Sequence, residues 1–309
     1  MRPIIIGEPT DLHVAAVATA VRARGSEPVV FSTSVLENED YRLDERSLDL
    51  GTDHLDFANG QGRGWIRRLA APGWRRSVTL ESHDGAVRSS LITLLTGLIR
   101  VLPVEWLSPL EQLLAADNKV IQWQACVALD IPVPRTIVTS NRSEIPSAFG
   151  DRLVAKPLGP GSYRAEDGGQ RVVLTTGLEA DDDRLDALDG APFIVQERLD
   201  AESHLRVVTV RDMSWVYESR ETTALDWRFT EGAHASFEYS RAWNPVAQMA
   251  IRLARHLGVG FSSQDWIVTD QRVVFLDLNP GGQWLFLPRR PADATEAIAA
   301  WLTPDRAQE

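Results

Sequence analysis

The stretch FLDLNPGGQW, residues 275–284, ends an apolar run with an acid, an amide, a proline and two glycines. Side chains on a strand alternate between its two faces. Asp277 and Asn279 are therefore expected on one face, with Leu276 and Leu278 pointing into the core. An acid and an amide on one face can bind a metal or simply close a turn.

The hairpin that delivers this strand brings in a third polar residue. If its turn has an odd length and is centred on Gln271, Asp265 lies directly across from Asp277 on the same face. Mg²⁺ binds carboxylates together with phosphates and water, and two facing acids repel each other unless a cation or proton intervenes. Asp and Asn also commonly end a strand before a turn. From these residues alone, a metal site and a turn stay equally open.

The basic residues are almost all arginine. Of 32 basic residues only two, Lys119 and Lys156, are lysine. A lysine ammonium is a compact, rotatable charge that can reach a phosphate oxygen inside a pocket, whereas arginine is a planar fork. The alternative is that the two lysines are retained by chance in an arginine-rich chain. Their surroundings must decide whether they have a functional role.

A glycine-rich loop follows the predicted strand that carries Lys156. It reads LGPGSYRAEDGGQ, residues 158–170, and contains Gly159, Gly161, Gly168 and Gly169. Backbone N–H groups of such a loop can cover phosphates, and a surface hairpin is the alternative. The chain has no GxxxxGK[ST] motif and no GxGxxG after its first strand, which disfavours P-loop and dinucleotide-binding proteins.

Composition excludes several classes. A net charge of −11 over 309 residues argues against nucleic acid as a partner, because phosphate backbones require a basic face. No apolar run reaches the length of a membrane span or of a secretory signal, so we expect a cytoplasmic protein. The six histidines lack metal-ligand spacing and no GxSxG motif is present, which disfavours zinc enzymes and serine hydrolases.

The order of predicted elements indicates mixed α/β and α+β architecture. Residues 3–31 read as strand, helix and strand of a parallel sheet, and short alternating runs between 47 and 68 predict a small antiparallel excursion. Asp117 is the expected N-cap of a helix beginning near Lys119. An acidic helix is expected around residues 179–190.

Two groups of arginines stand out against the acidic composition. They lie in GWIRRLAAPGWRR, residues 64–76, and at Arg289–Arg290. A net charge of −11 repels an acidic substrate at long range, so these arginines are candidate local attractors. Ordinary solvated surface arginines explain them equally well.

Taken in order, these segments resemble the ATP-grasp superfamily. They are DNK at 117–119, VAKP at 154–157 with its glycine loop, FIVQERL at 193–199, LRVVTV at 205–210, QDWIV at 264–268 and FLDLNPGGQW. The resemblance is greatest to the microviridin-type ligases that mature graspetides, and it extends to GWIRRLAAPGW. It implies an ATP-grasp fold in three parts: an N-terminal parallel-sheet (pre-ATP-grasp) domain in 1–115, a small central lobe in 116–195, and a C-terminal lobe with a metal site in 196–309.

The resemblance also assigns roles by position. Residues that contact ATP are then Lys119, Lys156, the glycines 159, 161, 168 and 169, and the hinge residues Gln196, Glu197 and Leu199. Arg206 neutralises charge on the transferred phosphoryl group, and the Mg²⁺ ligands are Asp265, Asp277 and Asn279. The family usually has Glu at the position of Asp277, and commonly an acid where this chain has His204. The ribose contact stays open between Asp200 and Glu202.

The implied reaction activates Asp or Glu side chains of a ribosomal precursor peptide as acyl-phosphates at the expense of ATP. A Lys amine or a Ser or Thr hydroxyl of the same peptide then forms a macrocyclic amide or ester. The implied partner is a precursor peptide with a leader and an acidic core, and a homodimer is a further option. The alternatives are a ligase that joins free amino acids or short peptides, and, less supported because every motif is present, a non-catalytic nucleotide-binding scaffold.

Overall fold

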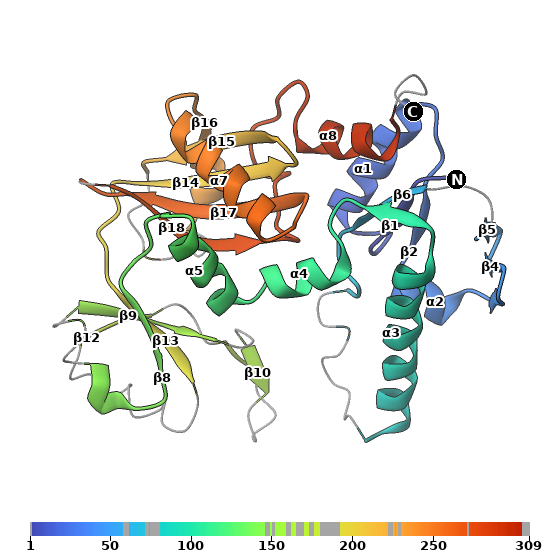
Figure 1. Cartoon of the computed structure of the whole chain (residues 1–309), viewed down its shortest axis with the longest axis horizontal. Coiled ribbons are helices and arrows are strands. Elements are labelled where there is room, and N and C mark those ends of the chain that lie inside the picture. The colour runs from blue at the N-terminus through green and yellow to red at the C-terminus, as the bar shows by residue number, and fades with distance from the viewer. Residues whose placement is uncertain are drawn as a thin grey trace.

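In the computed structural model, the described part of the chain forms five sheets with helices around them (Figure 1). The described residues are 2–57, 62–71, 74, 81–145, 149, 152–158, 162–164, 170–172, 176–179, 192–221, 225, 227, 230–270 and 272–304. Gly159, Gly161, Gly168 and Gly169 of the predicted phosphate loop lie outside them, as do residues 180–190 of the predicted acidic helix. None of the described helices has the length and hydropathy that a membrane crossing requires.

The N-terminal part is built on a parallel sheet, as the sequence predicts. Its strands, in the order β2-β1-β6-β7, are β1 (Ile4–Ile6), β2 (Val29–Phe31), β6 (Gly62–Ile66) and β7 (Val104–Trp106). The helices of this part are α1 (Leu12–Ala23), α2 (Thr33–Asn38) and α3 (His83–Val101). Strand β1 is completely buried, because a parallel sheet is covered on both faces.

The small antiparallel insertion is present, but its limits differ from the prediction. It consists of β3 (Tyr41–Leu43), β4 (Ser47–Leu50) and β5 (Asp53–Asp56). The prediction that the insertion continues to residue 68 is wrong, because β6 pairs in parallel with β1. Trp65 and Ile66 are both buried, so this segment needs cover on both faces. Gly64 permits the close packing, since a Cβ there would lie 2.4 Å from the Trp106 ring.

Two consecutive helices, α4 (Leu110–Ala116) and α5 (Lys119–Ala128), lead from this sheet to the rest of the chain. The prediction that Asp117 caps the second helix is wrong. Asp117 has helical backbone angles at the end of α4, whereas Asn118 is extended, and its side-chain oxygen accepts hydrogen bonds from the N–H groups of Val120 and Ile121. The cap makes Lys119 the first residue of α5.

The central part contains a four-stranded antiparallel sheet in the order β12-β9-β13-β8. Its strands are β8 (Thr136–Thr139), β9 (Arg152–Pro157), β12 (Thr176–Glu179) and β13 (Phe193–Glu197). A 3-10 turn, η1 (Arg142–Glu144), follows β8, and an antiparallel hairpin of β10 (Ser162–Arg164) and β11 (Gln170–Val172) follows β9. This sheet has a small apolar core of its own, which includes Ile145, Leu153 and Val195.

The C-terminal part contains the largest sheet, which is antiparallel and ordered β16-β15-β14-β17-β18. Its strands are β14 (Ser203–Val210), β15 (Met213–Ser219), β16 (Glu238–Tyr239), β17 (Phe261–Val268) and β18 (Val273–Asn279). The helices described in this part are η4 (Ala233–Ser236), α7 (Asn244–His256) and α8 (Ala294–Leu302).

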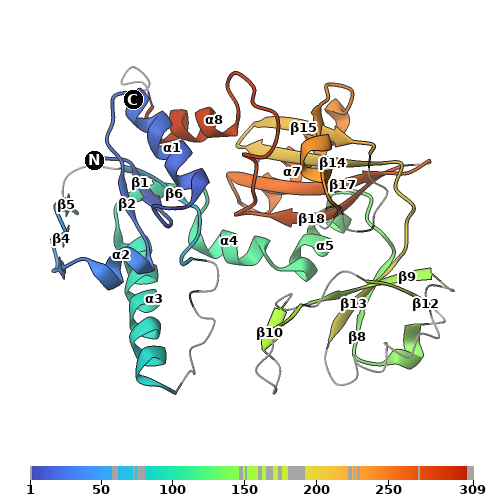
Figure 2. The ribbon, with the colours of Figure 1, turned by 180° about the vertical axis from the view of Figure 1, so that it is seen from behind.

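Two apolar cores cover the two faces of this sheet. One contains Leu205 and Val207 of β14 together with α5 and α7. The other contains Val208 and Val210 of the same strand together with α1, α8 and the segment around Trp284. Helices α1 and α8 lie against each other in both views (Figures 1 and 2), so the C-terminal helix packs on the N-terminal domain.

Candidate functional site

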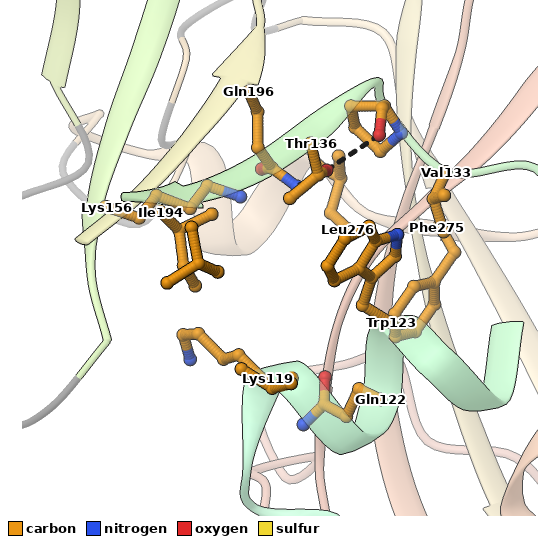
Figure 3. Close-up of a pocket in the computed structure, with 13 residues that line it drawn as sticks. Lys119, Gln122, Trp123, Val133, Thr136, Lys156, Ile194, Gln196, Phe275 and Leu276 are labelled. Atoms are coloured by element: carbon orange, nitrogen blue, oxygen red, sulfur yellow. Dashed lines mark hydrogen bonds between the residues drawn. The ribbon is translucent and has the colours of Figure 1, made fainter. Parts of the chain in front are cut away.

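A cavity that opens to solvent lies between the central sheet and the C-terminal sheet, with about 460 Å³ of empty space including part of the opening. Its walls come from α5, β8, β9, β13 and β18 (Figure 3). The apolar wall contains Trp123, Val133, Ile194, Phe275 and Leu276, and the polar side chains are Lys119, Gln122, Thr136, Lys156 and Gln196. An apolar slot with a few polar groups is the usual form of a small-molecule site.

Both lysines of the chain line this one cavity. Lys119 enters from the start of α5 and Lys156 from β9, where it pairs with Ile194 of β13. Figure 3 shows the two side chains reaching into the cavity from opposite sides. The two lysines are 37 positions apart in the chain and yet line the same cavity. Two lysines retained at random would not be expected to meet in this way. The arrangement presents two rotatable cations to one ligand.

Asp265 and Asp277 lie directly opposite each other on β17 and β18, as the sequence predicts, although the reason is different. The hairpin does not turn about Gln271, because Val268 pairs with Val273 and Trp266 with Phe275. A β-bulge at Leu276 then shifts the register by one residue and brings the two acids together. The bulge also corrects a second expectation: Leu276 faces the cavity and not the core.

Each of the two facing acids is paired with a cation. Arg206 of β14 donates from Nη1 to Oδ1 of Asp265 at 2.8 Å, and Nζ of Lys119 lies 3.4 Å from Oδ1 of Asp277. The side chain of Arg206 is only 8% exposed, so its charge acts in a poorly solvated environment. The four side chains therefore form a line of two ion pairs, in the order Arg206 (positive), Asp265 and Asp277 (negative) and Lys119 (positive).

Gln122 fixes the position of the strand that carries Asp277. Its Oε1 accepts the N–H of Leu278 at 2.9 Å, and its Nε2 donates to the C=O of Leu278 and to the C=O of Ala116, both at 2.7 Å. Gln122 is 2% exposed, so these bonds are shielded from water. They join the helix of Lys119 to the strand of Asp277.

Asn279, the third predicted metal ligand, ends β18 on the same face as Asp277. Its Oδ1 accepts the N–H of Gly281 at 2.9 Å, which is an Asx turn. The next glycine is needed for packing, since a Cβ on Gly282 would lie 2.4 Å from the side chain of Ser263. Asn279 therefore closes a turn, and it lies on the same face of β18 as Asp277.

The segment after Asn279 is tied to the N-terminal domain by a buried polar cluster. Arg67 donates to the C=O groups of Gly281 and Gly282, and its Nε lies 3.5 Å from Oδ2 of Asp11. His13 Nε2 accepts the N–H of Trp284 at 3.2 Å. Arg67 is 3% exposed, so it is neither a solvated surface arginine nor a surface attractor for a substrate. Arg75 and Arg76 of the same motif lie outside the described residues.

Burial changes the pKa values in this cluster. Burial lowers the pKa of Arg67 to about 10, which leaves it charged at neutral pH. Burial, followed by the charge of Arg67, also lowers the pKa of His13. Burial alone raises the pKa of Asp11, but hydrogen bonds from His13 and the charge of Arg67 outweigh it and hold that pKa well below its usual value. At neutral pH the cluster is therefore Asp11⁻, Arg67⁺ and neutral His13.

The predicted hinge residues divide between the cavity and its surroundings. Gln196 lines the cavity and donates to Oγ1 of Thr136 at 2.9 Å. The side chain of Glu197 is used elsewhere, because it accepts the N–H of Arg135 and pairs with Arg272 at 3.0 Å. Leu199 is half-buried and is not among the described residues that line the cavity.

Sequence reasoning missed several residues of the site. Trp123, Val133, Ile194 and Phe275 read as ordinary core positions, and only the fold turns them toward a cavity. Gln122 carried no distinguishing signal either, because its helix KVIQWQACVA contains a second glutamine, Gln124, and only the structure shows that Gln122 is the buried one. Of the two ribose candidates, Asp200 forms a surface pair with Arg152 at 2.8 Å.

Three solved structures illustrate what this architecture resembles. The macrocyclase MdnC from Microcystis aeruginosa MRC, bound with precursor peptide MdnA, has 20% identity and a TM-score of 0.81, over 98% of this chain and 99% of that one. A Chryseobacterium gregarium RiPP-associated ATP-grasp ligase with ADP and a leader and core peptide has 20% identity and a TM-score of 0.82, over 98% and 96%. The ATP-grasp ligase PsnB with minimal precursor, Mg and ADP has 21% identity and a TM-score of 0.71, over 97% and 96%.

These likenesses extend over nearly the whole of both chains. The chain therefore has the ATP-grasp fold, and the fold predicted from its motifs is confirmed. Its structure is similar to those of the macrocyclase MdnC and the ATP-grasp ligase PsnB. No protein-family model matches the sequence, and no curated protein matches it.

Proposed function

We propose that this protein is an ADP-forming ATP-grasp ligase that forms macrocyclic ester or amide bonds between side chains of a precursor peptide. The observation that carries the proposal is the line Arg206, Asp265, Asp277 and Lys119 at the edge of a cavity that holds both lysines. Such a line can organise the crowded negative charge of ATP and a carboxylate. The peptide complexes of MdnC and PsnB support the choice of substrate.

ATP is proposed to occupy the cavity between the two sheets. The adenine would lie in the apolar part, against Phe275, Leu276 and Ile194. The resemblance assigns the hinge beside it to Gln196, which lines the cavity, and to Glu197 and Leu199, which are not among its described lining residues. Lys119 and Lys156 would bind phosphate oxygens, and the glycines at 159, 161, 168 and 169 would cover them. The ADP complexes of the similar ligases support this placement.

The donor set beside the cavity fits Mg²⁺. Asp265 and Asp277 face each other and Asn279 follows on the same side, which gives two carboxylates and an amide, and hard divalent cations prefer oxygen ligands. These residues would hold Mg²⁺ with Lys119 as a neighbour. When bound, the metal supplies charge neutralisation at the phosphate oxygens.

In the first step a carboxylate oxygen of the peptide attacks the γ-phosphorus of ATP, the bond to the β-phosphate oxygen breaks, and ADP leaves. Arg206 is placed to neutralise the charge that develops on the transferred group, because its guanidinium is buried and held by Asp265. Lys119 and Lys156 hold the phosphates during transfer. The product is an acyl-phosphate.

In the second step an amine or hydroxyl of the same peptide attacks the acyl carbon and releases phosphate. The peptide loses one water molecule per bond in the overall reaction. Because water competes for the mixed anhydride, the site must exclude it, and no nucleophile from the protein is required. We infer that the cavity closes around the reactants during this step.

The test is to incubate the chain with ATP, Mg²⁺ and the peptide encoded by a short reading frame beside its gene. We expect ADP to form and the peptide mass to fall by one water per bond, with an acyl hydroxamate when hydroxylamine is added. Condensation of free amino acids or short peptides, with no change in the precursor, would favour the alternative ligase. ATP binding without ADP formation would indicate a scaffold.

Three further properties belong to the same proposal. The peptide core is acidic, since its Asp and Glu side chains are the groups activated. The protein acts in the cytoplasm, which supplies ATP. It forms a homodimer, for which the exposed edge strand β3, with Tyr41 and Leu43, offers a surface. Light scattering on the purified chain measures its molar mass in solution, and so tests for the dimer independently of activity.

A further inference from the structure

A second cavity, which also opens to solvent and has about 290 Å³ of empty space including part of the opening, lies on the other side of Arg206 from ATP's proposed site. Its walls come from β14, β15 and residues 284–294, and they include Val208, Trp215, Tyr217 and Trp284. None of the residues that line it also lines the nucleotide cavity. The two cavities therefore flank one reactive centre.

The first link between this cavity and the acids is a row of paired residues across the sheet. Asp277 pairs with Asp265, Asp265 with Arg206, and Arg206 with Tyr217. Directly opposed residues on neighbouring strands place their side chains on one face, about 5 Å apart. Tyr217 therefore stands beside Arg206, on the side away from the acids.

A second row runs parallel to the first. Asn279 pairs with Ser263, Ser263 with Val208, and Val208 with Trp215. Both rows have polar residues on β17 and β18 and become apolar on β15. The proposed metal ligands occupy one half of this surface and the cavity occupies the other half, with Arg206 at the boundary.

One segment, Gln283 and Trp284, contacts both halves of this surface, the polar half and the half with the second cavity. The C=O of Gln283 accepts hydrogen bonds from Nη2 of Arg206 at 3.2 Å and from Oγ of Ser263 at 3.3 Å. The next residue, Trp284, is a wall of the second cavity. A molecule in this cavity would therefore contact Trp284, which follows Gln283 in the chain, and Tyr217, which pairs with Arg206 across the sheet.

Two arginines and one acid lie at this cavity. The acid, Asp293, lines the cavity as the N-cap of α8, where its side chain accepts the N–H groups of Thr295 and Glu296. Arg289 lines it and is exposed, and the guanidinium of Arg290 lies 3.9 Å from the centre of the Tyr239 ring, which pairs with Tyr217. Burial raises the pKa of Tyr217 to about 12, so its hydroxyl stays neutral. Two arginines against one acid leave a net positive charge here, and in a chain of net charge −11 this favours an acidic ligand.

We propose that this second cavity binds the precursor peptide next to the carboxylate being activated, with an apolar side chain inside the cavity and an acidic neighbour on Arg289. This inference rests on the proposed function. In phosphoryl transfer the attacking and leaving oxygens are in line with the phosphorus. The peptide carboxylate must therefore arrive from the side opposite ADP, and the second cavity lies on that side of Arg206.

The experiment compares steady-state kinetics of two variants with the unmodified protein, using the precursor peptide and ATP. Leu285→Trp narrows the cavity from a half-buried position, and Arg289→Ala removes the charge at the mouth. Arg255→Ala is the matched control, because Arg255 is an exposed arginine on α7, which covers the other face of the sheet. Circular dichroism and thermal unfolding verify that each variant folds.

We expect the KM for the peptide to rise roughly tenfold or more in Leu285→Trp, the size of a pocket mismatch. In Arg289→Ala it should rise up to about fivefold, as for an exposed charge pair. The KM for ATP and the maximal rate should stay within about twofold of the unmodified protein in both. The Arg255→Ala control should match the unmodified protein.

A peptide KM that is unchanged in both folded variants, while the unmodified protein modifies the peptide, overturns the cavity assignment and leaves the proposed function standing. An equal rise in the Arg255→Ala control also overturns it, because net charge alone would then explain the effect. An unmodified protein that binds ATP but does not change the peptide overturns both proposals together.

Discussion

The side chain of Gln122 pairs with both the N–H and the C=O of Leu278, in the manner of an additional strand. Strand β18 is the edge of its sheet, so these groups would otherwise lack a partner on that side. Leu278 lies between Asp277 and Asn279. One buried amide thus sets the position of two proposed metal ligands relative to Lys119, which begins the same helix.

The variant Gln122→Met should separate this positioning role from simple packing. It leaves two backbone groups of Leu278 without partners, at about 1–3 kcal/mol for each buried group. We expect lower stability in urea and, at temperatures where the variant is folded, a higher Mg²⁺ concentration for half-maximal activity. Gln124→Met, an exposed site on the same helix, is the control. An unchanged Mg²⁺ requirement would limit Gln122 to a structural role.

Asp277→Asn tests the proposed metal site. The change keeps the size of the side chain and removes the charge that faces Asp265, so the fold should be kept. We expect activity to fall by about 10²- to 10³-fold, the loss typical of removing a group that stabilises transition-state charge. Peptide mass spectrometry and ADP release measure it. Full activity in this variant would contradict the metal assignment, and Asp212→Asn, at an exposed hairpin, controls for a lost carboxylate.

Arg67→Met tests the connection between the N-terminal domain and the segment after Asn279. Removing one partner of a buried ion pair leaves Asp11 uncompensated, which costs about 3–5 kcal/mol. The free energy of unfolding, measured with urea, should fall by that amount. Arg68→Met, at a half-buried neighbour, should change it by less than about 1 kcal/mol. Equal effects in the two variants would argue against a special role for Arg67.

Stability should fall as the pH drops below the ordinary histidine pKa of 6.5. The pKa of His13 is lowered in the folded chain, so below 6.5 the unfolded chain binds a proton that the folded chain does not. The loss continues until the pH reaches the lowered pKa. Protonation would also remove the lone pair on Nε2 that accepts the N–H of Trp284.

Urea unfolding of the unmodified protein and of His13→Gln between pH 7.5 and 5 measures this effect. The variant should be less stable at pH 7.5 and should lose less stability on acidification. His54 titrates with the opposite sign, because its pKa is raised by Asp49, and it is present in both proteins. The difference between the two curves of stability against pH therefore reports the contribution of His13 alone. Parallel curves would show that His13 does not contribute to the pH dependence.

The sequence by itself was enough to predict the fold and to single out most of the polar residues of the candidate site. The motifs stand in ATP-grasp order along the chain, and the alternation of a strand places Asp277 and Asn279 on one face regardless of what surrounds them. The scarcity of lysine is enough to single out Lys119 and Lys156. These features depend only on the order and type of residues along the chain, so they can be predicted without knowledge of the tertiary contacts.

The tertiary structure decided the features that depend on distant segments. The bulge at Leu276 sets which residue faces Asp265, and register across a hairpin depends on packing on both faces. Arg67 is buried only because the segment after Asn279 folds back onto the N-terminal domain. Gln122 gains its role from a strand 156 positions away. Burial and register arise from contacts between segments far apart in the chain, and no local pattern encodes them.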